Sequence, residues 1–412
     1  MKVLLISPYI PYPPITGGKV RVYNFLKKLS KKHEIVLICL LKNTDEFKDV
    51  KILEKQGFKI YPVLRRKAWS AQNLVRTLLT KYSFLTVVNN FSSETENLIL
   101  EVIKKEKPDL IHLETFYMAQ SLLAVRDKIK IPILLAKVDV EAQVYFRNAQ
   151  QKKNPLLKLV GYIDARKMLN YEVQVCQYFD KVTFASEIDR ILLTSYLKKR
   201  KISVATDLIP NGVDTKHYVP TKTKKYSKPT VVFLGNFRYF ANTDAAFFFV
   251  KNIWPLVTSQ IDAQLYIVGP LLPKGIQRLL SNDVAKLNSE NITVTGFVEE
   301  DIKKEILTKS WLSVAPIRIG SGTKLKILES MAIGTPVVAT PVGIEGIEAI
   351  NNNSVLVGDT PQQVANMVVK LLKDKPLREK VSKNARKLVE NVYEWEVIGN
   401  KLDGIYRDLT KK

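Results

Sequence analysis

The feature that most constrains the fold of this chain is a regular alternation of short apolar runs with longer segments of helical periodicity. The runs are rich in Val, Ile and Leu. In the first half they cover residues 3–7, 34–41, 59–63, 110–114, 131–137, 181–185 and 205–209. In the second half they cover residues 230–235, 263–269, 291–296, 311–317, 336–340 and 354–357. This order is typical of parallel α/β units, so we expect two doubly wound, Rossmann-like sheets.

The length of the chain, 412 residues, also indicates two domains. A single hydrophobic core usually stops growing before about 300 residues. Residues 219–229 have no apolar periodicity and are typical of a linker, which puts the boundary near residue 220. Ligands of doubly wound sheets bind at the carboxyl ends of the strands, so two such domains facing each other would enclose their substrates in one cleft.

The chain is strongly basic. Its formal net charge is +24, and residues 1–220 hold 37 basic and 21 acidic side chains. Three explanations are open: a nucleic acid, an anionic membrane, or a lysine-rich composition with no partner. The lysines are spread through helical segments and no recognisable nucleic-acid-binding module is present. We therefore expect no nucleic-acid partner and keep an anionic membrane surface as a candidate.

Cysteine content and the absence of long apolar runs restrict the location. Cys39 and Cys176 are too few for a disulfide framework and are typical of a reducing compartment. The sequence has no run of about 18 apolar residues that could form a membrane-spanning helix, and prolines interrupt the apolar start of the chain. We expect a cytoplasmic protein, soluble or peripheral on the inner face of the cell membrane, with no metal site.

Residues 316–340 carry the most informative local pattern. An apolar run leads into a loop with Gly320 and Gly322, then a helical segment beginning near Thr323, then the next apolar run. Glycines let a diphosphate approach the backbone, and the positive end of a helix dipole attracts it. The pattern favours a nucleoside diphosphate site. The plain alternative is an ordinary strand–loop–helix unit.

Three side chains after the glycines fit the same site. Lys324 and Lys326 add cationic charge at the start of the helix. Glu329 lies one to two turns further on, where a carboxylate can accept hydrogen bonds from a ribose. In the plain alternative the lysines are solvated and Glu329 pairs with Lys326.

From Glu329 the sequence continues Ser-Met-Ala-Ile-Gly-Thr-Pro-Val-Val-Ala-Thr, which resembles the donor-site signature of family 4 glycosyltransferases, of the group 1 glycosyl transferase type. These are retaining enzymes with the GT-B fold. Four other segments resemble motifs of this family, at residues 17–29, 180–190, 209–214 and 235–246. The resemblance covers nearly the whole chain. It implies an N-terminal acceptor-side domain at 1–220, a donor-binding domain at 221–395, and a helix at 396–412 that crosses back to the first domain.

The resemblance also implies which residues form the site. Glu329 would bind the ribose, and Phe297 and Val298 would contact the base unless they pack in the core. The diphosphate would be bound by Gly17, Gly18, Arg238, Gly320, Gly322, Thr323, Lys324 and Lys326. Because negative charge develops on the leaving diphosphate, Lys324 is also expected to act in catalysis.

In the first domain, Gly17 and Gly18 precede a helix expected to begin near Val20. Their amides would face the donor phosphates, with Arg21 nearby to add positive charge. The alternative is a plain turn that needs glycine for a positive φ angle.

Two positions depart from the family pattern. The first glutamate of the family motif Glu-x7-Glu, which helps orient the transferred sugar, would stand at Ser321. The histidine that many relatives carry after the strand at 131–137 is absent, and Asp139 occupies roughly its place, followed by Glu141. We take Asp139 as the catalytic candidate from this domain. His112 could face the site or be a core histidine.

The resemblance implies transfer of a sugar from a nucleoside diphosphate donor to an acceptor hydroxyl, with retention at the anomeric carbon. The acceptor would be a glycan or a lipid-linked glycan, and neither a cofactor nor a metal is expected. Two alternatives stay open: another GT-B enzyme such as a sugar-nucleotide epimerase, and a non-catalytic protein that binds nucleotide sugars.

One basic segment, residues 65–79, combines cations with Trp69, Leu74 and Leu78 in one expected helix. Such a helix can lie on an anionic bilayer. The alternative is a helix that packs its leucines on its own domain.

Overall fold

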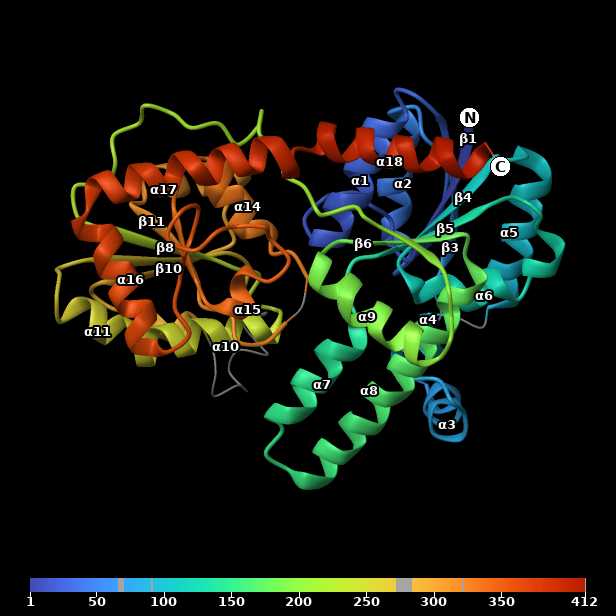
Figure 1. The fold of residues 1–412 in the computed structure, drawn as a ribbon, viewed down its shortest axis with the longest axis horizontal. Coiled ribbons are helices and arrows are strands. Elements are labelled where there is room, and N and C mark those ends of the chain that lie inside the picture. The colour runs from blue at the N-terminus through green and yellow to red at the C-terminus, as the bar shows by residue number, and fades with distance from the viewer. Residues whose placement is uncertain (66–69, 90–91, 272–283, 321, 412) are drawn as a thin grey trace. The chain divides into compact units, whose positions relative to one another are not determined.

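The computed structural model describes residues 1–65, 70–89, 92–271, 284–320 and 322–411. They form two compact units: unit 1 is Met1–Asn211 with Trp395–Lys412, and unit 2 is Gly212–Glu394. The change of unit at Asn211 falls earlier in the chain than the boundary expected near residue 220. Each unit has a parallel sheet covered by helices on both faces (Figure 1).

Unit 1 is built on a sheet of seven strands in the order β3-β2-β1-β4-β5-β6-β7. Its strands are β1 (Lys2–Ser7), β2 (Glu34–Leu41), β3 (Lys59–Leu64), β4 (Leu110–Glu114), β5 (Ile133–Lys137), β6 (Lys181–Phe184) and β7 (Ala205–Leu208). Strands β4 and β5 are buried at every position. Parallel strands with both faces covered read as continuous apolar runs, which is why the sequence revealed them.

Helices cover the unit 1 sheet on both sides. The helices of unit 1 are α1 (Gly17–Leu29), α2 (Phe47–Lys55), α3 (Ala71–Leu79), α4 (Phe84–Asn89), α5 (Ser93–Glu106), α6 (Ala119–Leu123), α7 (Glu141–Gln151), α8 (Pro155–Val175), α9 (Glu187–Lys199) and α18 (Trp395–Thr410). Cys39 and Cys176 are both buried and unlinked.

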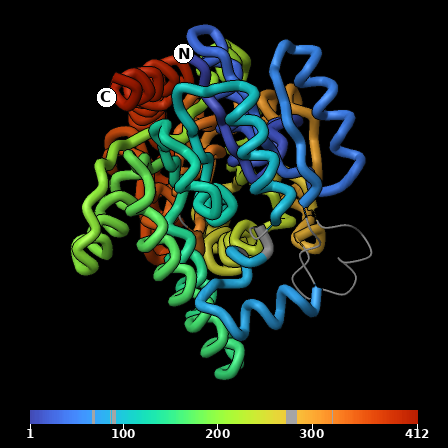
Figure 2. The backbone as a smooth tube through the Cα atoms, turned by 90° about the vertical axis from the view of Figure 1, so that its right-hand side faces the viewer, coloured from blue at the N-terminus to red at the C-terminus, as the bar shows by residue number. Residues whose placement is uncertain are grey.

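The last helix, α18, completes unit 1. It runs along α1, and Trp395, Leu402 and Tyr406 are buried in the same apolar cluster as Phe25 of α1. The ring of Trp395 packs edge-on against Phe25 with centroids 5.9 Å apart. Because β1 and α18 belong to the same unit, the two ends of the chain lie side by side (Figure 2).

Unit 2 has a sheet of six strands in the order β10-β9-β8-β11-β12-β13. Its strands are β8 (Thr230–Leu234), β9 (Gln264–Val268), β10 (Ile292–Gly296), β11 (Leu312–Ala315), β12 (Val337–Ala339) and β13 (Leu356–Val357). Its helices are α10 (Phe240–Phe248), α11 (Trp254–Thr258), α13 (Glu300–Lys309), α14 (Leu325–Ala332), α15 (Pro341–Ile344), α16 (Pro361–Lys373) and α17 (Lys375–Leu388), with π-helical segments at Phe249–Ile253 and Val389–Tyr393.

All the strand pairs of both sheets are parallel, and every strand begins within two residues of its expected run. In each sheet the strand order reverses once, between β1 and β4 in unit 1 and between β8 and β11 in unit 2. The prediction of two doubly wound, Rossmann-like α/β sheets is confirmed. Ligands of such sheets bind at the carboxyl ends of the two strands where the order reverses.

Candidate active site

The carboxyl ends of β8 and β11 carry the two loops of unit 2 that the sequence analysis singled out. The loop after β8 leads through Arg238 into α10, and the loop after β11 is the glycine loop, which leads into α14. Both loops therefore lie at the reversal point of the unit 2 sheet, where this class of fold binds its ligand.

The backbone of the glycine loop requires glycine. Gly320 has φ +142° and Gly322 has φ +68°, values that residues with a side chain rarely adopt. Ser321 lies between them, outside the described residues. Helix α14 begins at Leu325, slightly later than the expected start near Thr323, and Lys324 stands at its N-cap position. The first amides of a helix have no intrahelical acceptor, so this end of α14 is suited to an anion.

Two polar contacts hold the glycine loop and α14 against α10. The guanidinium of Arg318 binds both carboxylate oxygens of Asp244, at 2.6 and 3.0 Å. The ammonium of Lys326 donates to Oδ1 of Asn242 at 2.6 Å. Asn242 and Asp244 belong to the segment 235–246, which resembles a family motif, but the sequence alone gave them no role. The structure gives them one: they fix the position of the loop that is expected to bind the diphosphate.

Lys326 has an unusual environment for a lysine. Its side chain is half-buried, with the ammonium 5.0 Å from the centre of the Phe233 ring. Burial and the positive charge of Lys324 together lower the pKa of Lys326 to about 7, and the negative charge of Glu329 acts in the opposite direction. An anion bound beside this ammonium would favour its charged form.

Lys324 and Thr323 make contacts within unit 2 itself. The ammonium of Lys324 donates to the carbonyl oxygen of Gly322 at 2.7 Å, and the hydroxyl of Thr323 donates to the carbonyl oxygen of Gly346 at 3.2 Å. The Lys324 contact stabilises the turn that brings the lysine to the start of α14.

Glu329 does not pair with Lys326, the partner expected in the plain alternative. Its Oε2 lies 3.2 Å from the ammonium of Lys303 on α13. The same ammonium lies 3.0 Å from Glu300 and donates to the hydroxyl of Tyr218 at 2.8 Å. Burial opposes the charge on Lys303, but Glu329 and Glu300 hold its pKa above the ordinary value. Nothing in the sequence pattern indicated Lys303 or Tyr218.

The remaining unit 2 candidates are largely exposed. Arg238 is exposed and its Nε donates to the carbonyl oxygen of Leu271 at 3.1 Å. Phe297 directly follows β10 and is 66% exposed, so it is not a core residue. Val298 is partly buried against an apolar cluster of unit 2, which agrees with the alternative of core packing for this residue.

In unit 1 the two N-terminal glycines are helical. Helix α1 begins at Gly17, earlier than the expected start near Val20, so Gly17 and Gly18 form its first turn and not a separate loop. A Cβ atom at Gly18 would lie 2.2 Å from the hydroxyl oxygen of Tyr9. Close approach of this tyrosine, rather than a positive φ angle, is therefore the reason for glycine at position 18.

The expectation that Arg21 supplies charge near the donor phosphates is wrong. Arg21 is fully buried, and its Nε binds Glu114 at 2.8 Å. Its Nη1 donates to the carbonyl oxygens of Ile209 and Pro210 and to Oδ1 of Asn211, at 2.9, 3.0 and 3.1 Å. Arg21 thus ties the segment at 209–211 to Glu114 of β4, because burying a charged guanidinium is costly unless acceptors pair with it.

His112 is a core histidine, one of the two alternatives that the sequence left open. It is fully buried, with Nε2 3.2 Å from Glu114 and Nδ1 2.5 Å from the hydroxyl of Tyr406 on α18.

Asp139 and Glu141 follow β5 at the carboxyl edge of the unit 1 sheet. Burial raises the pKa of Tyr9, the negative charges of Glu114 and Asp139 raise it further, and the positive charge of Arg21 opposes the shift. Glu141 begins α7 and accepts a hydrogen bond from the Tyr117 hydroxyl. Burial raises the pKa of the Glu141 carboxyl.

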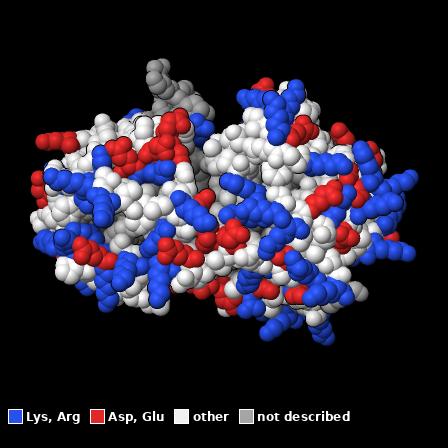
Figure 3. All heavy atoms as spheres, turned by 90° about the horizontal axis from the view of Figure 1, so that it is seen from above, with Lys and Arg blue, Asp and Glu red and all other residues white. Residues whose placement is uncertain are grey.

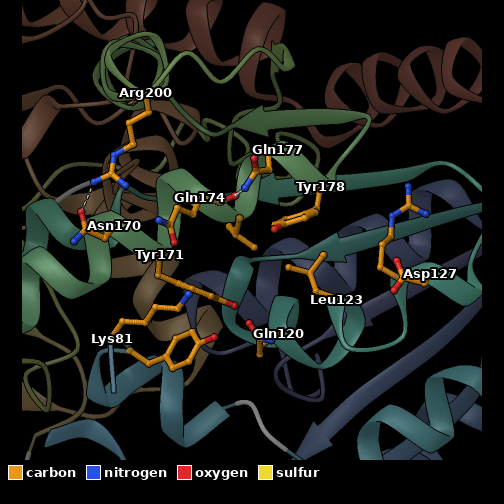
Figure 4. A pocket seen from close by; sticks show the side chains of 13 residues that line it. Lys81, Gln120, Leu123, Asp127, Asn170, Tyr171, Gln174, Gln177, Tyr178 and Arg200 are labelled. Carbon is orange, nitrogen blue, oxygen red and sulfur yellow. Dashed lines mark hydrogen bonds between the residues drawn. The ribbon is translucent and has the colours of Figure 1, made fainter. Parts of the chain in front are cut away.

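A cavity of about 700 Å³ lies elsewhere in unit 1 (Figure 4). Its lining includes Gln120 of α6, Asn170 and Tyr171 of α8, and Arg200, whose guanidinium bonds Asn170 at 2.5 Å. The cavity also takes residues from the segments that lead into β5 and β6, so it lies toward the amino ends of these strands. It contains none of the expected site residues.

Within the described part of the chain, no group of His, Cys, Asp and Glu side chains is arranged to hold a metal ion. None of the helices that the structure describes is both long and apolar enough to cross a bilayer. On the face seen in Figure 3, Lys and Arg side chains are spread among acidic ones instead of forming one patch.

Solved structures with the same fold define the class of protein. The sucrose-phosphate synthase of Thermosynechococcus elongatus superposes with a TM-score of 0.73 at 17% identity, over 100% of this chain and 99% of that chain. Anabaena HepE, solved in complex with UDP and glucose, superposes with a TM-score of 0.66 at 14% identity, over 99% and 100%. The chain has the GT-B fold of these glycosyltransferases.

Sequence comparison relates unit 2 to a known family. Residues 228–374, most of unit 2, match the family model of the group 1 glycosyl transferases. An uncharacterized 44.6 kDa protein in the cps region of Klebsiella pneumoniae is 22% identical over 404 residues, 95% of this chain and 96% of that protein. The GDP-mannose-dependent monoacylated alpha-(1-6)-phosphatidylinositol monomannoside mannosyltransferase of Corynebacterium glutamicum is 26% identical over 213 residues, which span 48% of this chain and about half, 55%, of that enzyme. Residues 228–374 thus match the group 1 glycosyl transferases, and the chain is a glycosyltransferase.

Proposed function

We propose that the protein transfers a sugar from a nucleoside diphosphate donor to a hydroxyl of a glycan or lipid-linked acceptor, with retention at the anomeric carbon. The observation that carries this proposal is the glycine loop at the reversal point of the unit 2 sheet. Arg318 and Lys326 tie this loop to α10, and it ends in the amides and lysines at the start of α14.

The names of similar proteins support this donor and acceptor chemistry. HepE was solved with UDP and glucose, and the Corynebacterium relative is named for a GDP-mannose donor and a phosphatidylinositol mannoside. UDP-glucose, with which HepE was also solved, and GDP-mannose both present a nucleoside diphosphate as the leaving group. We propose the same class of donor for this chain, without choosing a base or a sugar.

We assign the residues as follows. The amides near Gly320 and Gly322, together with Arg238, Lys324 and Lys326, would neutralise the charge that develops on the leaving diphosphate. Glu329 would bind the ribose and Phe297 the base. In unit 1 we propose Gly17 and Gly18 as contacts of the donor phosphates and Asp139 as a catalytic residue. The mechanism needs no metal ion, because lysines and helix amides supply the positive charge.

The proposal is tested by incubating the protein with UDP-, GDP- and dTDP-sugars, with and without a lipid extract that supplies the acceptor. We expect one donor to release its nucleoside diphosphate faster with the extract, and Lys326→Gln to abolish this release. The matched control is Lys387→Gln, an exposed lysine of α17. Proton NMR of the product should show the anomeric configuration of the donor.

Two results would contradict the proposal. Conversion of the sugar nucleotide to an epimer, without release of diphosphate, would indicate another GT-B activity. Tight binding of a nucleotide sugar with no turnover on any acceptor extract would indicate a binding protein.

A further inference from the structure

We propose that α3 and the N-terminal half of α8 form a docking surface by which unit 1 binds an anionic lipid bilayer. The proposal concerns a surface of unit 1, whereas the glycine loop belongs to unit 2, and it does not depend on which sugar is transferred. The docking surface consists of nine exposed apolar side chains: Leu74, Val75, Leu78, Leu79, Leu156, Leu157, Leu159, Val160 and Ile163.

The α7–α8 hairpin is a well-packed element with one face left uncovered. Gly161 lets the two helices approach closely, since a Cβ atom there would lie 2.9 Å from the Cβ of Ala149. Asn154 caps α8 by accepting hydrogen bonds from the amides of Leu156 and Leu157. The first turns of α8 are therefore fixed, yet Leu156 remains 68% exposed and Leu157 53% exposed.

Helix α3 adds to the same region. The ammonium of Lys167 in α8 donates to the carbonyl oxygen of Thr77 in α3 at 2.6 Å, which ties the two helices together. No residue of α3 is buried, and Leu78 and Leu79 are 78% and 81% exposed. Figures 1 and 2 place α3 and the hairpin tip at the same end of unit 1.

The structure thus disagrees with the alternative that the helix in 65–79 packs its leucines on its own domain. The cations at positions 66 and 67, and Trp69, lie outside the described residues. The apolar contribution of α8 was missed, because a run of leucines at helical spacing is usually a core face.

The charge around the docking surface identifies its partner. No Asp or Glu occurs at residues 55–93 or 142–163, the two segments that contain it, whereas both contain several Lys and Arg residues. Lys152 and Lys153, at the tip of the hairpin, are exposed. Exposed apolar patches mark interaction sites. A second copy of this chain would bring cations against cations, whereas an anionic bilayer accepts both the apolar side chains and the charge.

The test is co-sedimentation with vesicles of phosphatidylcholine alone and of phosphatidylcholine mixed with phosphatidylglycerol. The protein should pellet with the anionic vesicles and much less with the neutral ones, and added salt should weaken the binding. Equal recovery on both kinds of vesicle, or none on either, would overturn the proposal.

Two double variants assign the binding to this surface. Leu156→Ser with Leu157→Ser should lower the partition coefficient about tenfold or more, since binding scales with the apolar area that enters the interface. Lys152→Gln with Lys153→Gln should lower it about fivefold per lysine on anionic vesicles only. All four side chains are exposed, so the circular dichroism and melting temperature should not change.

Matched controls come from α9 of the same unit. Ile188 and Ile191 are 50% and 61% exposed, and Ile188→Ser with Ile191→Ser should bind vesicles like the unchanged protein. Lys198→Gln with Lys199→Gln is the control for the loss of two positive charges, and it should also bind vesicles like the unchanged protein. If the control variants lost as much vesicle binding as the variants of the docking surface, the binding could not be assigned to that surface. A dimer in sedimentation velocity that the leucine variant dissociates, with no vesicle binding, would show self-association instead.

Discussion

At the scale of single residues, Lys326 illustrates how position changes the chemistry of a side chain. Partial burial and the neighbouring Lys324 bring its pKa to about 7, so at neutral pH it carries a full charge only part of the time. A bound diphosphate would raise this pKa again, and binding above pH 7 would therefore take up a proton. Lys326 would then be positively charged when the diphosphate leaving group is bound. In the free protein it would be partly neutral, which reduces its repulsion with Lys324.

We predict that UDP binds more weakly as the pH rises from 7 to 9. The free protein loses the Lys326 proton in this range and must regain it on binding, so affinity falls by up to about tenfold per pH unit. Titration calorimetry in two buffers of different ionisation enthalpy measures the proton uptake. Lys326→Gln should weaken binding roughly tenfold or more at pH 7, because a hydrogen bond to a charged group contributes about 1.5–3 kcal/mol.

The same variant should also lose the pH dependence, whereas Lys324→Gln should retain it. Proton uptake that persists in Lys326→Gln would assign the titrating group to another residue.

At the scale of elements, the donor-side loops depend on how closely β8 and β9 approach at their carboxyl ends. Gly269 directly follows β9 and has a φ angle of +139°. A Cβ atom at this position would lie 1.8 Å from the carbonyl oxygen of Gly235, which directly follows β8. Gly235 opens the loop that leads to Asn242 and Asp244. The position of α10, and with it that of the glycine loop, therefore depends on a contact that only glycine permits.

We predict that Gly269→Ala destabilises unit 2 by about 3 kcal/mol or more, since the φ angle alone costs about 1–3 kcal/mol and the clash adds to it. Urea unfolding should show this loss, and UDP affinity should fall with it. The control is Gly404→Ala in α18, where a Cβ atom meets nothing within 4 Å. This change should be neutral or stabilise by about 0.5–1 kcal/mol. Equal stability of the two variants would contradict the argument.

The strands could be predicted from the sequence because parallel strands buried on both faces leave continuous apolar runs. Helix starts were less accurate, as for α1 and α14, because glycines and lysines tolerate both loop and first-turn positions. Arg21 was misassigned since a buried arginine and a phosphate-binding arginine look alike in a sequence. The partners of Glu329 were missed because Lys303 is distant in the chain and belongs to no motif.

At the scale of the whole molecule, unit 1 is made from two separated parts of the chain. Helix α18 contributes Trp395, Leu402 and Tyr406 to its core and reaches the buried His112–Glu114–Arg21 group through the Tyr406 hydroxyl. The stability of unit 1 therefore depends on residues that follow unit 2 in sequence.

We predict that Trp395→Ala lowers the free energy of unfolding of unit 1 by about 3–5 kcal/mol, the usual cost of removing a large buried aromatic side chain. Hydrogen exchange should show the loss in β1, β4 and α1, and leave the strands of unit 2 protected. Val397→Ala, on the exposed side of the same helix, is the control and should change stability by less than about 0.5 kcal/mol. Loss of protection spread evenly over both units would show that they unfold together.

The discontinuity of unit 1 also sets the order of events during synthesis. All of unit 2, Gly212–Glu394, emerges from the ribosome before α18 does. Until then, the face of the sheet that Trp395 and Tyr406 later cover is exposed on an otherwise finished domain. Domains usually complete their folding in the order in which they are translated. In this protein unit 2 can complete its folding first. Unit 1 keeps an exposed apolar face until α18 has been synthesised and packs against it.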